Sequence, residues 1–103
     1  MAIPLIPPEL AERCETACAE AVRRGGFEKQ ARQAQEELAE LTAAINQFYR
    51  GREGSLEDVL EEAADVLLCM VQLRLMFGDG IDQWIRKKLE RIEQRVASND
   101  PRL

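Results

Sequence analysis

Apolar side chains recur at helical spacing along almost the whole chain, and no segment alternates in the way a strand would. The spacing predicts four helices, over residues 8–25, 28–49, 56–76 and 81–97. Gly25 and Gly26 end the first, and a polar loop over residues 50–54 separates the second from the third. Because short connections favour antiparallel neighbours, we expect an all-α four-helix bundle in a single domain, residues 1–103.

The last two predicted helices differ in their pattern. Residues 59–75 are apolar almost all round, so the third helix is expected to be the most buried. Ser55, with Asp58 three residues later, predicts a side-chain cap at its start. The fourth helix is apolar on one side only, at Ile81, Trp84, Ile85, Leu89, Ile92 and Val96.

Composition narrows the function classes. Apolar residues make up 46 % of the chain and charged residues 32 %, as in ordinary globular domains, and the net charge of −5 disfavours nucleic-acid binding. No run approaches the ~20 apolar residues of a membrane span. The first eight residues, interrupted by prolines, do not resemble a signal peptide. We therefore expect a cytoplasmic protein with no nucleic-acid or membrane partner, whose modest core is completed by oligomerisation.

Cysteine usage agrees with a reducing compartment. Cys14, Cys18 and Cys69 are odd in number and form no CxxC pair. Cys14 and Cys18 lie one helical turn apart, which suits neither a disulfide nor a zinc site. We expect all three to be small, buried, free thiols.

Two acidic clusters interrupt the apolar faces of the second and third predicted helices. Glu37 and Glu40 are spaced i, i+3, as are Glu62 and Asp65, so each pair shares one helix face. Carboxylates on an apolar face are costly unless something neutralises them. If the helices pack antiparallel, all four converge into an oxygen-only site for a hard cation such as Mg²⁺, since the chain has no histidine. Taken singly, each acidic pair is more typical of a solvated helix face, although Asp65 stands among Ala64, Val66, Leu67 and Leu68 in the most apolar helix.

Together the clusters form the pattern EExxE, a spacer, then ExxD. The matching segments are Glu36-Glu37-Leu38-Ala39-Glu40-Leu41 and Glu61-Glu62-Ala63-Ala64-Asp65-Val66-Leu67. The region of about residues 30–95 resembles the MazG-like branch of the all-α nucleoside triphosphate pyrophosphohydrolases. This resemblance implies that a (deoxy)nucleoside triphosphate is hydrolysed to the monophosphate and pyrophosphate, with water attacking the α-phosphorus. It also implies a homodimer or homotetramer with active sites near subunit contacts.

The resemblance assigns roles by motif position. Glu37, Glu40, Glu62 and Asp65 would bind Mg²⁺, with Mn²⁺ as a substitute ion. Glu36 would be the spare carboxylate that orients or deprotonates water or holds a second ion.

Cations are expected to hold the rest of the triphosphate, and Lys88, Arg91 and Arg95, at i, i+3, i+7, are our choice. A solvated basic helix end explains them equally well. The family often carries an Asn in this region, where this chain has Ile92.

Two rival functions remain. Related pyrophosphatases act on dUTP or phosphoribosyl-ATP, but the latter usually have a His soon after the ExxD aspartate, and this chain has Val66-Leu67-Leu68-Cys69 there. The other rival is a non-enzymatic helical dimerisation or regulatory module with a vestigial acidic site. The sequence favours no particular nucleotide.

Overall fold

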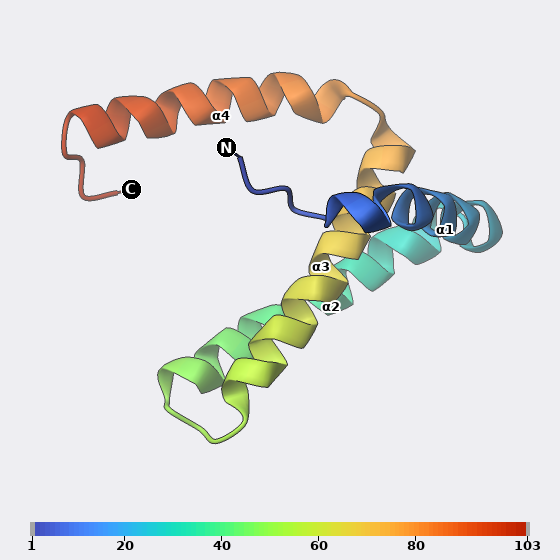
Figure 1. Ribbon diagram of the computed structural model, residues 1–103, viewed down its shortest axis with the longest axis horizontal. Coiled ribbons are helices and arrows are strands. Elements are labelled where there is room, and N and C mark those ends of the chain that lie inside the picture. The colour runs from blue at the N-terminus through green and yellow to red at the C-terminus, as the bar shows by residue number, and fades with distance from the viewer. Residues whose placement is uncertain (1, 103) are drawn as a thin grey trace.

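The chain folds into helices joined by short turns (Figure 1). The structure, a computed structural model, describes residues 2–102. A 3-10 turn, η1 (Pro8–Leu10), leads into four α-helices: α1 (Ala11–Gly25), α2 (Phe27–Tyr49), α3 (Ser55–Phe77) and α4 (Gly80–Ala97). The predicted all-α class is confirmed, and no strand occurs between residues 2 and 102. Each of the last three helices begins one residue earlier than expected.

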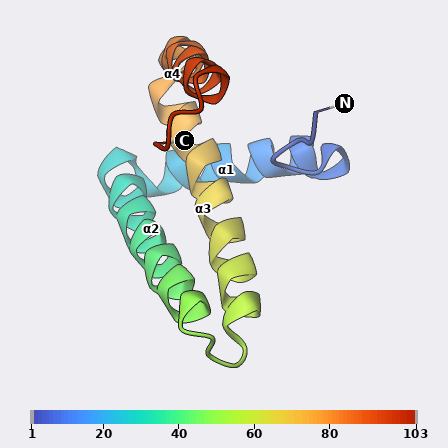
Figure 2. The ribbon, with the colours of Figure 1, turned by 90° about the vertical axis from the view of Figure 1, so that its left-hand side faces the viewer.

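An antiparallel hairpin of α2 and α3 forms the body of the molecule. The two helices run side by side from the loop at residues 50–54, as both ribbon views show (Figure 2). α1 crosses the open end of this hairpin, where it contacts both helices. α3 is therefore the central helix, and it touches each of the other three.

α4 stands apart from the rest of the chain. Among the helices of residues 2–102 it contacts only α3, and it runs away from the hairpin after the turn (Figure 1). The radius of gyration is 16.1 Å, whereas a compact chain of this length has about 13 Å. One chain therefore does not close a four-helix bundle by itself.

The core is thin. Within residues 2–102 the buried apolar side chains are small: Cys18, Ala34, Ala44 and Cys69. No large side chain in that range is wholly buried. Even the central helix α3 leaves Leu60 56 % exposed. The expectation that α3 is the most buried helix thus holds for its position but not for its side chains.

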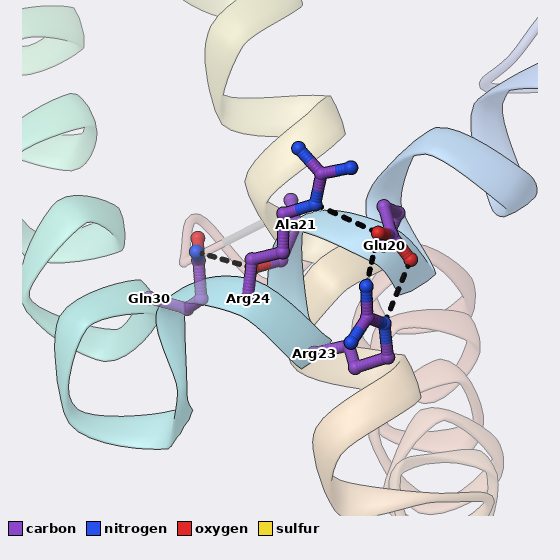
Figure 3. Close-up of polar contacts among 5 residues, drawn as sticks. All are labelled: Glu20, Ala21, Arg23, Arg24 and Gln30. Atoms are coloured by element: carbon purple, nitrogen blue, oxygen red, sulfur yellow. Dashed lines mark hydrogen bonds and ion pairs between the residues drawn. The ribbon is translucent and has the colours of Figure 1, made fainter.

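The side chain of Gln30, in α2, forms a hydrogen bond back to α1 across the turn between the two helices. Its side chain is only 5 % exposed, and its Nε2 donates a hydrogen bond of 2.9 Å to the Ala21 carbonyl (Figure 3). A Cβ on Gly25 would lie 2.4 Å from this nitrogen, and Gly26 has a φ of +83°. The glycine pair thus gives Gln30 room to cross back to α1.

An ion-pair cluster covers the outer surface near the end of α1. The Glu20 carboxylate accepts hydrogen bonds from the guanidinium groups of both Arg23 and Arg24 (Figure 3). These contacts lower the pKa of Glu20. Because the groups are exposed, the cluster contributes little to stability.

The start of α3 differs from the sequence-based expectation. Ser55 is the first helical residue and does not cap the helix, because its Oγ donates to the Arg52 carbonyl. Gly54, at φ +77°, precedes it in a left-handed conformation. The predicted Ser55 cap is wrong because the loop offers this hydroxyl a carbonyl three residues upstream.

The cysteines are free thiols, as expected. Cys18 and Cys69 are buried and Cys14 is partly buried. Burial raises the pKa of Cys18 to about 11, so this thiol is protonated near neutral pH. No helix within residues 2–102 has both the length and the apolar character needed to cross a membrane.

Candidate metal centre

The antiparallel pairing of α2 and α3 brings the two acidic motifs together. Glu37 and Glu40 project from α2, and Glu62 projects from α3. One carboxylate oxygen from each of these residues lies within 4.8 Å of the others. The i, i+3 spacing aligns the first two on one face of α2, and the hairpin register supplies the third. Glu37 and Glu62 are partly buried, whereas Glu40 is exposed.

Asp65 borders this group of three oxygens without belonging to it. The carboxylate of Asp65 is close enough to Glu37 and Glu62 for its negative charge to raise the pKa of both. It lies nearly one turn along α3 from Glu62. The structure thus gathers all four sequence-predicted ligands in one region, with three of them in closest proximity.

Burial and mutual repulsion hold protons on the cluster. Burial, together with the neighbouring carboxylate of Glu40 and the charge on Asp65, raises the pKa of Glu62 from 4.5 to about 7. The pKa of Glu37 is also raised, chiefly by burial and then by the charges of Glu40 and Asp65. Without a cation, the cluster therefore resists full ionisation at neutral pH.

Two oxygen atoms in the cluster lack any partner. Glu37 Oε2 and Glu62 Oε2 are shielded from solvent and accept no hydrogen bond. An ionised carboxylate oxygen can only accept, so burying it without a donor or a cation is unfavourable. Several carboxylate oxygens and no nitrogen or sulfur ligand form a donor set that suits Mg²⁺ or Mn²⁺. The residues present therefore fit such an ion.

Glu36 lies outside the cluster. It precedes Glu37 by one residue, which places it about 100° away around α2, and it is exposed. There it lines an open hollow together with Lys29, Arg32 and Gln33. Glu36 is thus not one of the three closest carboxylates, although its charge contributes to the raised pKa of Glu37, and two cations lie near it.

The basic residues proposed for phosphate binding also lie away from the cluster. Lys88, Arg91 and Arg95 are on α4, which makes no contact with α2 in the described part of the chain. Arg91 and Arg95 line a shallow hollow near the end of α4 with Asp100 and Arg102. A single chain does not bring these cations to its own carboxylates.

Sequence reasoning overlooked neighbours on the same stripe of α3. Cys69 is one turn beyond Asp65, and the charges of Glu37 and Asp65 add to burial in raising its pKa. Gln72 follows two turns beyond Asp65, and its Oε1 is buried without a partner. The i+4 and i+7 positions after Asp65 could have revealed both residues.

Comparisons with known proteins add no family assignment. No protein-family model, curated protein or solved structure matches this chain. The features that bear on function are therefore the acidic cluster, the spacing of its two motifs and the surfaces around it.

Proposed function

We propose that this protein is a Mg²⁺-dependent nucleoside triphosphate pyrophosphohydrolase of the MazG-like type. It would convert a (deoxy)nucleoside triphosphate and water into the nucleoside monophosphate and pyrophosphate, with attack at the α-phosphorus. The observation that carries the proposal is the meeting of the EExxE and ExxD carboxylates across α2 and α3, with Glu37 Oε2 and Glu62 Oε2 buried and unpaired.

Each carboxylate has a role in this proposal. Glu37, Glu40, Glu62 and Asp65 hold the ion, which when bound offsets phosphate charge and favours ionisation of a nearby water. Partial burial of Glu37 and Glu62 limits the water around their carboxylates. Glu36 is the spare carboxylate that orients or deprotonates the attacking water. Lys29 and Arg32 share its hollow and are cations beside Glu36.

The proposal includes assembly and location. We infer a homodimer or homotetramer of the MazG-like bundle, because one chain leaves a thin core and a detached α4. A nucleotide substrate agrees with a cytoplasmic location. Phosphoribosyl-ATP is a less suitable substrate than a nucleoside triphosphate, because Val66 to Cys69 contain no His after Asp65.

One observation favours a second candidate function. The apolar side of α4 is exposed along its whole length, as in a helix that acts by binding another protein. In a purely structural dimerisation module the acidic cluster would be vestigial. Such a module would neither bind Mg²⁺ nor release pyrophosphate.

The deciding experiment measures pyrophosphate release from a panel of canonical and modified NTPs and dNTPs, with Mg²⁺ or with EDTA. Metal-dependent release that is lost in Asp65→Asn and Glu62→Gln supports the proposal. Glu61→Gln is the matched control, because Glu61 is an exposed carboxylate next to Glu62 and outside the proposed ligand set. Absence of release from every nucleotide favours the module instead, and a ranking of the nucleotides identifies the substrate class.

A further inference from the structure

The apolar stripe of α4 has no partner within its own chain. It comprises Ile81, Trp84, Ile85, Leu89, Ile92 and Val96, which are between 36 % and 60 % exposed. At 100° per residue, these side chains lie within about 140° of one another around the helix. Among the helices of residues 2–102, α3 is the one that contacts α4. An amphipathic helix of this kind needs an apolar surface to cover its stripe.

A second exposed stripe runs along α2. Leu38, Ile45 and Phe48 are between 39 % and 48 % exposed and share one face of the helix. Phe48 is only about 20° around α2 from Glu37, so this stripe adjoins the acidic cluster. Leu56, Leu60 and Leu68 of α3 are also exposed, but they lie at least 120° around that helix from Glu62. The α2 stripe is therefore the uncovered apolar surface that adjoins the acidic cluster.

The charges of the two elements are opposite. α4 carries five cationic side chains against three carboxylates. The α2–α3 hairpin, residues 27–77, carries ten carboxylates against five cations. Two α4 helices would repel each other, whereas α4 and the hairpin attract.

We propose that the apolar stripe of α4 packs on the α2 stripe of a second copy of this chain. The α4 stripe of the second copy packs in the same way on the α2 stripe of the first. A two-fold axis then closes the dimer and covers both stripes in both chains. Pairing of α4 with α4 would leave Leu38, Ile45 and Phe48 exposed. A different protein that bound only α4 would leave the same three residues exposed. The reciprocal dimer would also add buried apolar surface to a chain whose own core is thin.

This arrangement brings cations to the acidic cluster of the other chain. Lys88, Arg91 and Arg95 lie together along one edge of the α4 stripe, between 20° and 80° of rotation from Ile81 at 100° per residue. Packing of the stripe beside Glu37 of the second chain places this edge at the interface. If the proposed pyrophosphohydrolase activity holds, each active site then combines the carboxylates of one chain with the cations of the other.

The first test measures mass and the environment of Trp84, the only tryptophan. Light scattering should give about twice 11.7 kDa for a two-fold dimer. Trp84 emission should shift to shorter wavelength as concentration rises, because its 60 % exposed ring becomes covered. A monomer at every concentration, with solvent-like Trp84 emission, overturns the proposal without reference to activity.

Matched variants test the surfaces. Ile92→Glu and Ile45→Glu should each weaken the dimer at least tenfold, because each buries a charge in the interface. Gln94→Glu and Ala43→Glu add the same charge to opposite, exposed faces of α4 and α2 and should leave the mass unchanged. Circular dichroism shows whether each variant keeps its helices. If Ile92→Glu breaks the dimer and a folded Ile45→Glu does not, α4 does not pack on the α2 stripe and the proposal is wrong.

Complementation tests the shared active site. Asp65→Asn and the double variant Arg91→Ala with Arg95→Ala should each be inactive alone. After unfolding and refolding together, statistical mixing in a two-fold dimer should restore about a quarter of wild-type pyrophosphate release, since one site in each mixed dimer is intact. No recovery in mixed dimers contradicts the shared site. If the wild type itself releases no pyrophosphate, the proposed function fails, and the mass and Trp84 measurements still decide the interface.

Discussion

Arg74, in the last turn of α3, and Asp82, in the first turn of α4, form a bidentate ion pair. Arg74 Nη1 lies 2.7 Å from Asp82 Oδ1, and Nη2 lies 2.9 Å from Oδ2. The pair spans the turn at Gly78, whose φ is +73°. Its hydrogen bonds lower the pKa of Asp82 and raise that of Arg74. Because α4 has few other contacts with its own chain, this pair helps to set the direction in which α4 leaves.

Removal of the ion pair should loosen α4 without unfolding the protein. Asp82→Asn replaces a carboxylate that accepts two charged hydrogen bonds with an uncharged amide. We expect faster amide hydrogen exchange over residues 78–86 and little change in Tm, because both side chains are partly exposed. Asp79→Asn removes a nearby charge that makes no such pair and serves as the control. Equal exchange in both variants contradicts the assigned role.

Metal binding should stabilise the protein through the acidic cluster. At a Mg²⁺ concentration one hundred times Kd, the free energy of unfolding should rise by about 2.7 kcal/mol, which thermal denaturation detects. Glu62→Gln should lose this response and should be more stable than the wild type in EDTA, because one repelling charge is gone.

Glu61→Gln is the control for metal binding, since it removes an exposed neighbouring carboxylate. It should keep the wild-type response to Mg²⁺. An equal Mg²⁺ response in wild type and Glu62→Gln assigns the ion to another part of the surface.

Stability in EDTA should depend on pH in a defined direction. The pKa of Glu62 is about 7 in the folded chain and 4.5 ordinarily, so between these values the folded state binds a proton that the unfolded chain has released. This contribution is fully present below pH 4.5 and is lost as pH rises through 7. Tm in EDTA should therefore fall between pH 5 and pH 8, and saturating Mg²⁺ should reduce the fall.

The same titration with variants isolates Glu62 from the general acidity of the chain. Glu62→Gln should show a shallower decline of Tm with pH than Glu61→Gln, although both remove one carboxylate. Parallel curves for the two variants would mean that Glu62 does not hold the proton.

Gln30 should be needed for the turn between α1 and α2. Gln30→Ala removes the hydrogen bond to the Ala21 carbonyl and a buried side chain, at a cost of about 1–3 kcal/mol in the free energy of unfolding. Urea denaturation measures this loss. Gln35→Ala, at an exposed position of α2, should change stability by less than ~0.5 kcal/mol. A similar effect of both substitutions would show that the bond to Ala21 is not stabilising.

The parts of the site that depend on one helix alone were accessible from sequence. The i, i+3 spacing placed Glu37 with Glu40, and the same rule placed Glu62 with Asp65. It also implied that Glu36 points elsewhere, since successive residues diverge by 100°. Assignment by motif position did not take into account that Glu36 lies on a different face of α2 from Glu37 and Glu40. In the structure Glu36 lines a hollow with Lys29 and Arg32.

The cap at Ser55 failed for a related reason. A serine before an apolar helix has two acceptable uses for its hydroxyl, one toward the helix amides and one toward the preceding loop. In the folded chain the Ser55 hydroxyl donates to the Arg52 carbonyl of the preceding loop, so the loop conformation, which local sequence rules do not specify, settles the choice.

The sequence by itself determined the helical class, the approximate ends of the helices and the face on which each carboxylate lies. These properties follow from periodicity and turn residues, which act over a few positions of the chain. Only the tertiary structure decided that Glu62 meets Glu37 and Glu40 more closely than Asp65 does, because that depends on the register of α3 against α2. It also decided that α4 leaves the hairpin. Helical periodicity specifies directions about a helix's own axis and contains no information about where a second helix lies.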